Sequence, residues 1–190
     1  MPNVIILAGP NGSGKSTAAP ALLKETLHVD YFINADVIAQ GLCAYQPEKA
    51  AIQAGKIMLD QIHLLANQKA NFAFETTLAG RTFATWLATL KKQGYQFHLA
   101  FLWLKNVELA LSRVQARVTM GGHSIPEATI RRRYTAGLRN FFNLYCPLAD
   151  SWQLYDSSIK VTLIAAKSSN GEILVKRPKI WEYLREVYYG

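Results

Sequence analysis

The stretch NVIILAGPNGSGKST, residues 3–17, joins a run of apolar residues directly to a glycine-rich turn that ends in lysine and serine. Residues 9–16 satisfy G-x-x-x-x-G-K-[ST], a pattern that binds the phosphates of a nucleoside triphosphate when it lies between a strand and a helix. The glycines let successive backbone N–H groups turn inward around a phosphate chain, and the N-terminus of the following helix adds a favourable dipole. Lys15 is expected to reach the β- and γ-phosphates, and Ser16 to ligate Mg²⁺. We predict that ATP contacts Gly9, Pro10, Asn11, Gly12, Ser13, Gly14, Lys15, Ser16 and Thr17.

Strand-like and helix-like segments alternate along the rest of the chain. Apolar runs bounded by turn residues occur at 3–8, 71–76, 95–104 and 152–156, and helical patterns at 47–69, 81–93 and 107–120. This alternation is typical of a mostly parallel sheet with helices on both faces, so we predict a three-layer α/β fold of the P-loop NTPase or kinase type. In the segment 47–69, one apolar face is expected to hold Ile52, Leu59, Ile62 and Leu65.

The C-terminal part of the chain has a different pattern. Asn170-Gly171 lies between two short apolar runs and predicts a β-hairpin, and a last helix is expected over residues 178–188. No linker, repeat or low-complexity segment interrupts the chain, so residues 1–190 are expected to form a single domain.

Composition limits the class of protein. Half of the 190 residues are hydrophobic, which is typical of a packed globular chain. Lys and Arg number 21 against 13 Asp and Glu, and the resulting charge of +8 favours an anionic partner. Cys43 and Cys146 are too few for a disulfide framework or a zinc site. Because no leader precedes the first apolar run and the run 97–104 is too short to span a bilayer, we expect a soluble, cytoplasmic protein.

Two polar clusters follow apolar runs, where ligands of open α/β sheets bind. Asp36 comes after the short run 31–33 and is expected to orient an acceptor hydroxyl and take its proton; an N-cap of the following helix is the alternative. Glu75, Thr76 and Thr77 end the strand 71–76, and Arg81 follows. We expect these four residues to contact the substrate, with metal as a further partner of Glu75 and helix capping as the alternative for the two threonines.

The stretch GGHSIPEATIRRRY, residues 121–134, leads from two glycines into three arginines. Ser124 and Glu127 have the spacing of a capping box, which predicts that a helix starts just after the glycines. Arg113 and Arg117 share one face of the preceding helix. The segment from about residue 110 to 140 is therefore expected to be a helix, a glycine break and a second helix, with arginines on both helices. This arrangement predicts a lid over the phosphate site.

Helical geometry separates the arginines of this lid. Positions 131, 132 and 133 lie about 100° apart around the helix, so they cannot all face one ligand. We expect Arg117, together with Arg132 or Arg133, to reach the transferred phosphate, and Arg131 to remain in solvent. His123 is expected to be a loop or cap residue.

The ordered set GPNGSGKST, NAD, ETTLAG, GGHSIPEATIRRRY and YDSS resembles the zeta-toxin-like kinases, the compact bacterial members in particular, over about residues 3 to 160. The resemblance implies a P-loop kinase fold and phosphorylation of a sugar hydroxyl by ATP and Mg²⁺. It implies UDP-N-acetylglucosamine as acceptor in the long members, and an antitoxin protein as partner. It assigns the catalytic base to Asp36, substrate contacts to Glu75 and Thr77, and lid arginines to Arg117 and the 131–133 cluster.

One departure from the family pattern affects the acceptor. Where the long members carry Glu-x-Thr-Leu-Arg, this chain reads Glu75-Thr76-Thr77-Leu78-Ala79, and its arginine stands at Arg81. We therefore predict a kinase for a sugar or nucleotide-sugar hydroxyl, with a nucleotide, an antibiotic or a polynucleotide end as other acceptors. The alternative from another class is an NTP-dependent switch or ABC-like ATPase. We do not expect membrane or nucleic-acid binding, because the sequence contains no matching motif.

Overall fold

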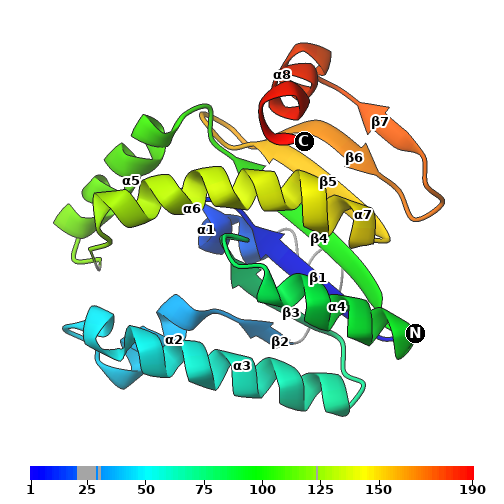
Figure 1. Cartoon of the computed structure of the whole chain (residues 1–190). Helices are drawn as coiled ribbons and strands as arrows, with labels where there is room; N and C mark the ends of the chain where they lie inside the picture. Colours follow the sequence, from blue (N-terminus) through cyan, green and yellow to red (C-terminus); the bar gives the residue numbers. More distant parts are fainter. Residues whose placement is uncertain (21–28, 30, 123) are drawn as a thin grey trace.

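The computed structural model describes residues 1–20, 29, 31–122 and 124–190 (Figure 1). His123 therefore lies outside the described residues. The described residues include a seven-stranded sheet in the order β2-β3-β1-β4-β5-β6-β7. Its strands are β1 (Asn3–Ala8), β2 (Tyr31–Ile33), β3 (Phe72–Thr76), β4 (Gln96–Trp103), β5 (Ser151–Asp156), β6 (Thr162–Lys167) and β7 (Ile173–Val175). Neighbouring strands from β2 to β5 are parallel, and β6 and β7 extend the sheet antiparallel, as the hairpin prediction requires.

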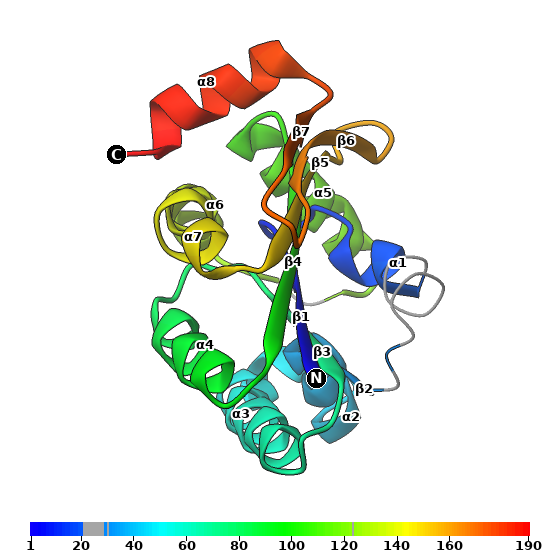
Figure 2. The ribbon, with the colours of Figure 1, turned by 90° about the vertical axis from the view of Figure 1, so that its right-hand side faces the viewer.

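Helices connect the parallel strands. The α-helices are α1 (Lys15–Ala19), α2 (Ala35–Leu42), α3 (Ala51–Asn67), α4 (Thr82–Lys92), α5 (Val107–Thr119), α6 (Glu127–Asn140), α7 (Cys146–Leu148) and α8 (Pro178–Tyr188). A 3₁₀ turn, η2 (Pro47–Ala50), precedes α3, and a π-helical turn, η3 (Phe141–Tyr145), follows α6. Figure 2 shows the sheet nearly edge-on, with α4 and α6 on one side and α1 on the other. The predicted α/β fold is confirmed. Within the described ranges, every helix is too short or too polar to cross a membrane.

The central strands are buried on both faces, which is why they read as continuous apolar runs. Side chains alternate along β1: Val4 and Ile6 belong to a large core cluster, whereas Ile5 and Leu7 belong to a smaller one on the opposite face. Helices α3, α4, α6 and α8 contribute to the large cluster, and α1 contributes Ala19 to the small one. Packing on both faces holds the carboxyl ends of β1 and β3 side by side, with Ala8 opposite Thr76.

The face predicted for the segment 47–69 is wrong in part. Ile62 and Leu65 of α3 are buried in the core, but Ile52 is 81% exposed and Leu59 is 43% exposed. Positions 52 and 59 lie two turns apart on a side of α3 that neighbours the core side. That side lines a cavity next to the glycine-rich turn instead.

The start predicted for the lid's second helix is also wrong. The helix α6 begins at Glu127, and the residue before its first turn is Pro126, whose carbonyl oxygen accepts from the backbone N–H groups of Thr129 and Ile130. No side chain caps this helix, so Ser124 and Glu127 do not form a capping box. The Glu127 carboxylate instead binds Arg131 one turn later, at 2.8 Å, because the fixed φ of proline already sets the entry of the chain into the helix.

Candidate active site

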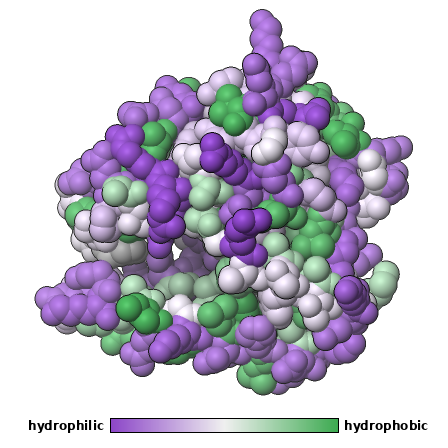
Figure 3. All heavy atoms as spheres, viewed as in Figure 1, coloured by the Kyte–Doolittle hydropathy of each residue, from purple (hydrophilic) through white to green (hydrophobic). Residues whose placement is uncertain are grey.

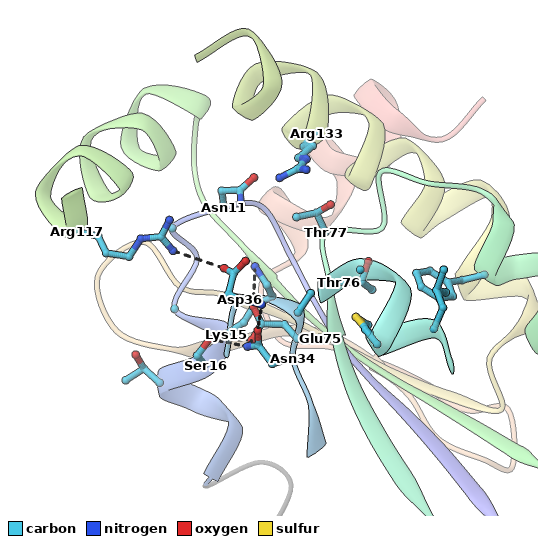
Figure 4. Close-up of a pocket in the computed structure, with 18 of the residues that line it drawn as sticks. Asn11, Lys15, Ser16, Asn34, Asp36, Glu75, Thr76, Thr77, Arg117 and Arg133 are labelled. Carbon is cyan, nitrogen blue, oxygen red and sulfur yellow. Dashed lines mark hydrogen bonds and ion pairs between the residues drawn. The ribbon is translucent and has the colours of Figure 1, made fainter. Parts of the chain in front are cut away.

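The P-loop turns between β1 and α1 in the way that its glycines permit. Gly9, Gly12 and Gly14 have φ angles of 144°, 76° and 81°, and a Cβ at Gly9 or Gly12 would collide with a backbone carbonyl oxygen of a neighbouring segment. The turn borders a cavity of about 700 Å³, also lined by α2, α3, the end of β3, α4, α5 and α6 (Figure 4). Of the predicted ATP contacts, the residues that line this cavity are Asn11, Gly12, Gly14, Lys15, Ser16 and Thr17; Gly9, Pro10 and Ser13 form the backbone behind them.

Lys15 is the buried cation of the site. Its side chain is 7% exposed, and its Nζ donates to the carbonyl oxygens of Gly9 at 3.0 Å and Pro10 at 2.9 Å. The Glu75 carboxylate lies 3.6 Å from the same Nζ. Burial lowers the pKa of Lys15 below its ordinary value, and the charge of Glu75 opposes that shift. The ammonium group is thus held at the floor of the P-loop, where a phosphate chain would arrive.

Glu75, Ser16 and Asn34 form a hydrogen-bonded group at the carboxyl end of β3. Ser16 Oγ donates to Glu75 Oε2 at 2.8 Å, and Asn34 Nδ2 donates to the same oxygen at 2.7 Å. The Glu75 side chain is 12% exposed and Asn34 is 5% exposed. Asn34 was not among the residues predicted for the site, although an asparagine directly before a helix signals an N-cap.

The oxygen atoms of this group fit a magnesium ion. Mg²⁺ prefers one or two carboxylate or hydroxyl ligands and fills its other positions with water and substrate phosphates. Ser16 and Glu75 supply one hydroxyl and one carboxylate beside the P-loop. Among the described residues, no group of three or more His, Cys, Asp and Glu side chains is placed to hold a metal ion.

Asp36 faces the cavity from the first turn of α2. It does not cap this helix: Asn34 Oδ1 accepts from the backbone N–H groups of Asp36 at 2.7 Å and Val37 at 3.3 Å. The cap interpretation of Asp36 is therefore wrong, because the preceding asparagine fulfils that role. The Asp36 carboxylate is about half exposed and lies 3.9 Å from the guanidinium group of Arg117, as Figure 4 shows.

Helices α5 and α6 place their arginines unequally with respect to the cavity. Arg113 and Arg117 of α5 and Arg133 of α6 line the cavity. Arg132 is exposed and does not line it, and Arg131 binds Glu127 and Glu108 at the surface. Of the two arginines left open at 132 and 133, the structure thus turns Arg133 inward. Burial and the neighbouring charge of Arg132 lower the pKa of Arg133.

The loop between β3 and α4 is held by α6. Gly137 of α6 packs against the Thr77 carbonyl oxygen so closely that a Cβ there would collide with it. Asn140 Nδ2 donates to the Leu78 carbonyl oxygen at 2.7 Å, and Leu78 is buried with a φ of 55°. A buried leucine in this left-handed region is strained, so the surrounding contacts must hold the loop.

Of three other predicted substrate contacts, two line the cavity and one does not. Thr76 and Thr77 line the cavity, and the Thr76 hydroxyl accepts from the backbone N–H of Leu78 at 3.2 Å. Neither threonine caps α4, because the residue before that helix is Arg81 and no side chain caps it. Arg81 itself is exposed and does not line the cavity.

A distant stretch of the chain supports the P-loop from behind. Ser157 follows β5, is 7% exposed, and donates from its hydroxyl to the Ser13 carbonyl oxygen at 2.7 Å. Arg113 donates to the carbonyl oxygens of Gly12 at 3.4 Å and Ser158 at 2.7 Å. The two contacts to the P-loop, at Gly12 and Ser13, join residues 101 and 144 positions apart in sequence. No local pattern could have revealed them.

A family comparison matches most of the chain. The sequence model described as zeta toxin matches residues 1–164. An uncharacterized protein of Haemophilus influenzae is 34% identical over 130 residues, which cover 68% of this chain and 91% of that protein.

Solved structures of similar fold include the following two. The AvrRxo1-ORF1:-ORF2 complex with ATP has a TM-score of 0.79 at 17% identity, over 97% of this chain. The match spans 63% of that protein's length, so this chain corresponds to less than two thirds of it. The PezAT chromosomal toxin-antitoxin system of Streptococcus pneumoniae has a TM-score of 0.67 at 19% identity, over 100% of this chain and 79% of that one. At these identities the likeness shows a shared fold.

Proposed function

The chain belongs to the zeta toxin family of ATP-dependent phosphotransferases, and on that premise we propose that it phosphorylates a hydroxyl group of a sugar or nucleotide-sugar, with Asp36 as the base. One observation carries the proposal: Asp36, Lys15 and the lid arginines Arg117 and Arg133 border a single cavity next to the P-loop. Phosphoryl transfer needs an acceptor base, a phosphate cradle and cations over the transferred group, and this cavity offers a residue for each.

The reaction moves one phosphoryl group. The acceptor oxygen forms a bond to the γ-phosphorus of ATP while the bond between that phosphorus and the β–γ bridging oxygen breaks, so ADP leaves. The hydroxyl proton passes to the Asp36 carboxylate, which is within the cavity and open to an entering acceptor. The guanidinium group of Arg117 lies 3.9 Å from that carboxylate, beside the place where the acceptor hydroxyl would enter.

The P-loop and the lid contribute charge stabilisation. Lys15 would exchange its bonds to the Gly9 and Pro10 carbonyl oxygens for the β- and γ-phosphates. Arg117 and Arg133 would approach the equatorial oxygens of the transferred group, where charge is spread in the transition state. A magnesium ion held by Ser16 and Glu75 would neutralise phosphate charge when bound. Asn34 keeps the Glu75 carboxylate in place through its hydrogen bond of 2.7 Å.

A transfer screen with product masses tests the proposal. ATP and Mg²⁺ are incubated with sugars, UDP-sugars, nucleosides, an aminoglycoside and a short oligonucleotide. We expect a gain of one phosphate on a sugar or UDP-sugar. Asp36→Asn should lower transfer about 10²-fold or more, while ATP binding is kept. Transfer only to the oligonucleotide or to the antibiotic would reject the sugar assignment, and full activity of Asp36→Asn would reject the base.

We extend the proposal to a protein antitoxin as partner. The support is that one similar structure belongs to a toxin-antitoxin system. Growth of cells that express the wild-type chain should be impaired, and Lys15→Ala should relieve the impairment if the kinase reaction causes it. Equal growth of both strains would show that the chain is not toxic under these conditions, and the antitoxin proposal would be rejected.

A further inference from the structure

The active-site cavity has two chemically different walls. The lid side carries the three arginines of α5 and α6 that line the cavity. The opposite side, built by α3 and α4, carries Ile52, Met58, Leu59 and Phe83. Figure 3 shows a hollow on the face seen in Figure 1, with hydrophobic residues gathered along its lower edge. Phosphates suit the first wall, and the second wall suits an uncharged group.

The apolar wall contains a seat on α3, which we call the α3 ledge: Ile52, Gly55 and Leu59. Positions i, i+3 and i+7 share one side of a helix, so these residues form a row along the cavity. Ile52 is 81% exposed and Leu59 is 43% exposed, so a bound group could cover apolar surface on both. Gly55 leaves the space between them open, since nothing lies within 4 Å of a Cβ built there.

Charge on this side of the cavity is sparse. Of the described lining residues on α3, α4 and the segment 76–77, Lys56 is the one cation, and its side chain is exposed. Arg81 lies outside the cavity. The other polar groups on this side are the threonines Thr76, Thr77 and Thr82, which can bind neutral hydroxyls. A diphosphate buried here would have one solvated ammonium group as its partner, which is weak compensation for its desolvation.

We propose that the α3 ledge seats an uncharged apolar or aromatic group of the phosphate acceptor, next to the hydroxyl that Asp36 addresses. This inference rests on the proposed kinase function and narrows it. The acceptor class is an alcohol, such as a sugar, that carries an aryl or alkyl substituent, and it is not a sugar linked to a nucleoside diphosphate. The hydroxyl end meets Asp36 and the threonines, and the substituent covers Ile52 and Leu59.

Three glucose derivatives with the same α-anomeric configuration and different substituents test the inference. They are methyl α-glucoside, 4-methylumbelliferyl α-glucoside and UDP-glucose. We expect the aryl glucoside to be phosphorylated with a kcat/KM about tenfold or more above the other two, the scale set by one apolar contact in a pocket. A higher kcat/KM for UDP-glucose, or equal values for the aryl and methyl glucosides, would overturn the inference.

Variants on α3 locate the effect. Leu59→Gln and Ile52→Gln should each raise the KM for the aryl glucoside about tenfold while kcat and the KM for ATP stay constant, because they remove binding that is equal in the ground and transition states. Gly55→Leu should block the seat. The matched controls are Leu64→Gln and Ile57→Gln, which change exposed apolar residues of the same helix outside the cavity. Lys56→Gln should leave the kcat/KM for all three compounds unchanged. A selective fall in kcat/KM for UDP-glucose would favour a phosphate contact at Lys56 and count against the ledge.

Direct binding separates this inference from the kinase proposal. Fluorescence anisotropy of the aryl glucoside is measured with ATP and Mg²⁺ present, with and without Leu59→Gln. If the aryl glucoside binds, Leu59→Gln weakens that binding, and no phosphate is transferred, then the α3 ledge is supported and the sugar-kinase proposal is rejected. If phosphate is transferred and neither Leu59→Gln nor Gly55→Leu changes the rate, then the kinase proposal stands and the α3 ledge is rejected.

Discussion

Gly137→Ala is a substitution for which helix propensity and tertiary packing predict opposite results. Gly137 lies inside α6, where alanine would normally stabilise a helix by about 0.5–1 kcal/mol. In this fold, however, a Cβ at position 137 would lie closer than 3.0 Å to the Thr77 carbonyl oxygen, a separation that real Cβ atoms essentially never show. The obstacle is backbone, so α6 and the loop after β3 must move apart by about 1 Å.

The magnitude follows from these two effects. Overpacking of this kind costs about 1–3 kcal/mol, which exceeds the gain in helix propensity. We therefore expect Gly137→Ala to lower the free energy of unfolding by about 1–2 kcal/mol and the Tm by roughly 2–8 °C. Gly41→Ala in α2 is the matched control, because nothing lies within 4 Å of a Cβ there. It should raise the free energy of unfolding by about 0.5–1 kcal/mol.

Activity should fall more than stability suggests. Arg133 lies one helical turn before Gly137 on α6, and both Arg133 and Thr77 line the cavity. A displacement of about 1 Å at such groups can lower transfer on the order of 10²-fold. Urea denaturation and steady-state kinetics of the two glycine variants measure the two effects. If Gly137→Ala were as stabilising as Gly41→Ala, the contact between α6 and Thr77 would be refuted.

Three further predictions test single contacts of the site. Ser157→Ala removes a buried hydrogen bond to the Ser13 carbonyl oxygen that contributes about 1 kcal/mol, so the KM for ATP should rise about fivefold with kcat unchanged; an unaltered KM in an ATP titration would contradict this. Arg133→Ala should lower kcat about 10²-fold while Arg132→Ala leaves it unchanged, and equal losses in the same assay would contradict the inward position of Arg133. Burial lowers the pKa of Lys15, so the unfolded chain binds more protons than the folded one between that lowered pKa and 10.5. The free energy of unfolding, measured by urea denaturation at several alkaline pH values, should therefore rise with pH across this window. If the free energy of unfolding of Lys15→Met rises equally with pH, Lys15 is excluded as the source.

Local patterns predicted the elements of the fold and the phosphate cradle. The strands at 3–8, 71–76, 95–104 and 152–156 and the hairpin at Asn170-Gly171 were recognisable because burial on both faces and turn chemistry leave a mark on neighbouring residues. The P-loop was equally legible, since its glycines, lysine and serine act within one turn of backbone. The ordered motifs were also sufficient to indicate the family that the comparison with residues 1–164 confirms.

Where two local signals competed, the sequence left the choice open or the prediction was wrong. Asp36 and Asn34 both stand at the start of α2, and only the structure shows that Asn34 accepts the backbone bonds and leaves the Asp36 carboxylate to the cavity. Ser124 and Glu127 have the spacing of a capping box, but Pro126 occupies the position before the helix. Each of these choices depends on φ and ψ at one residue, which a spacing rule does not contain.

Local sequence therefore specifies the chemistry that lies within a few consecutive residues: the phosphate cradle, the order of strands and helices, and the arginines available in the segment 110–140. The tertiary structure alone decided which of those side chains meet. It turned Arg133 inward and Arg132 outward, placed Ser157 behind the P-loop, brought Glu75 to Ser16, and exposed Ile52 and Leu59 to the cavity. The reason is physical: a pattern of one helix or strand specifies its faces, but what each face meets depends on the packing of segments far apart in the chain.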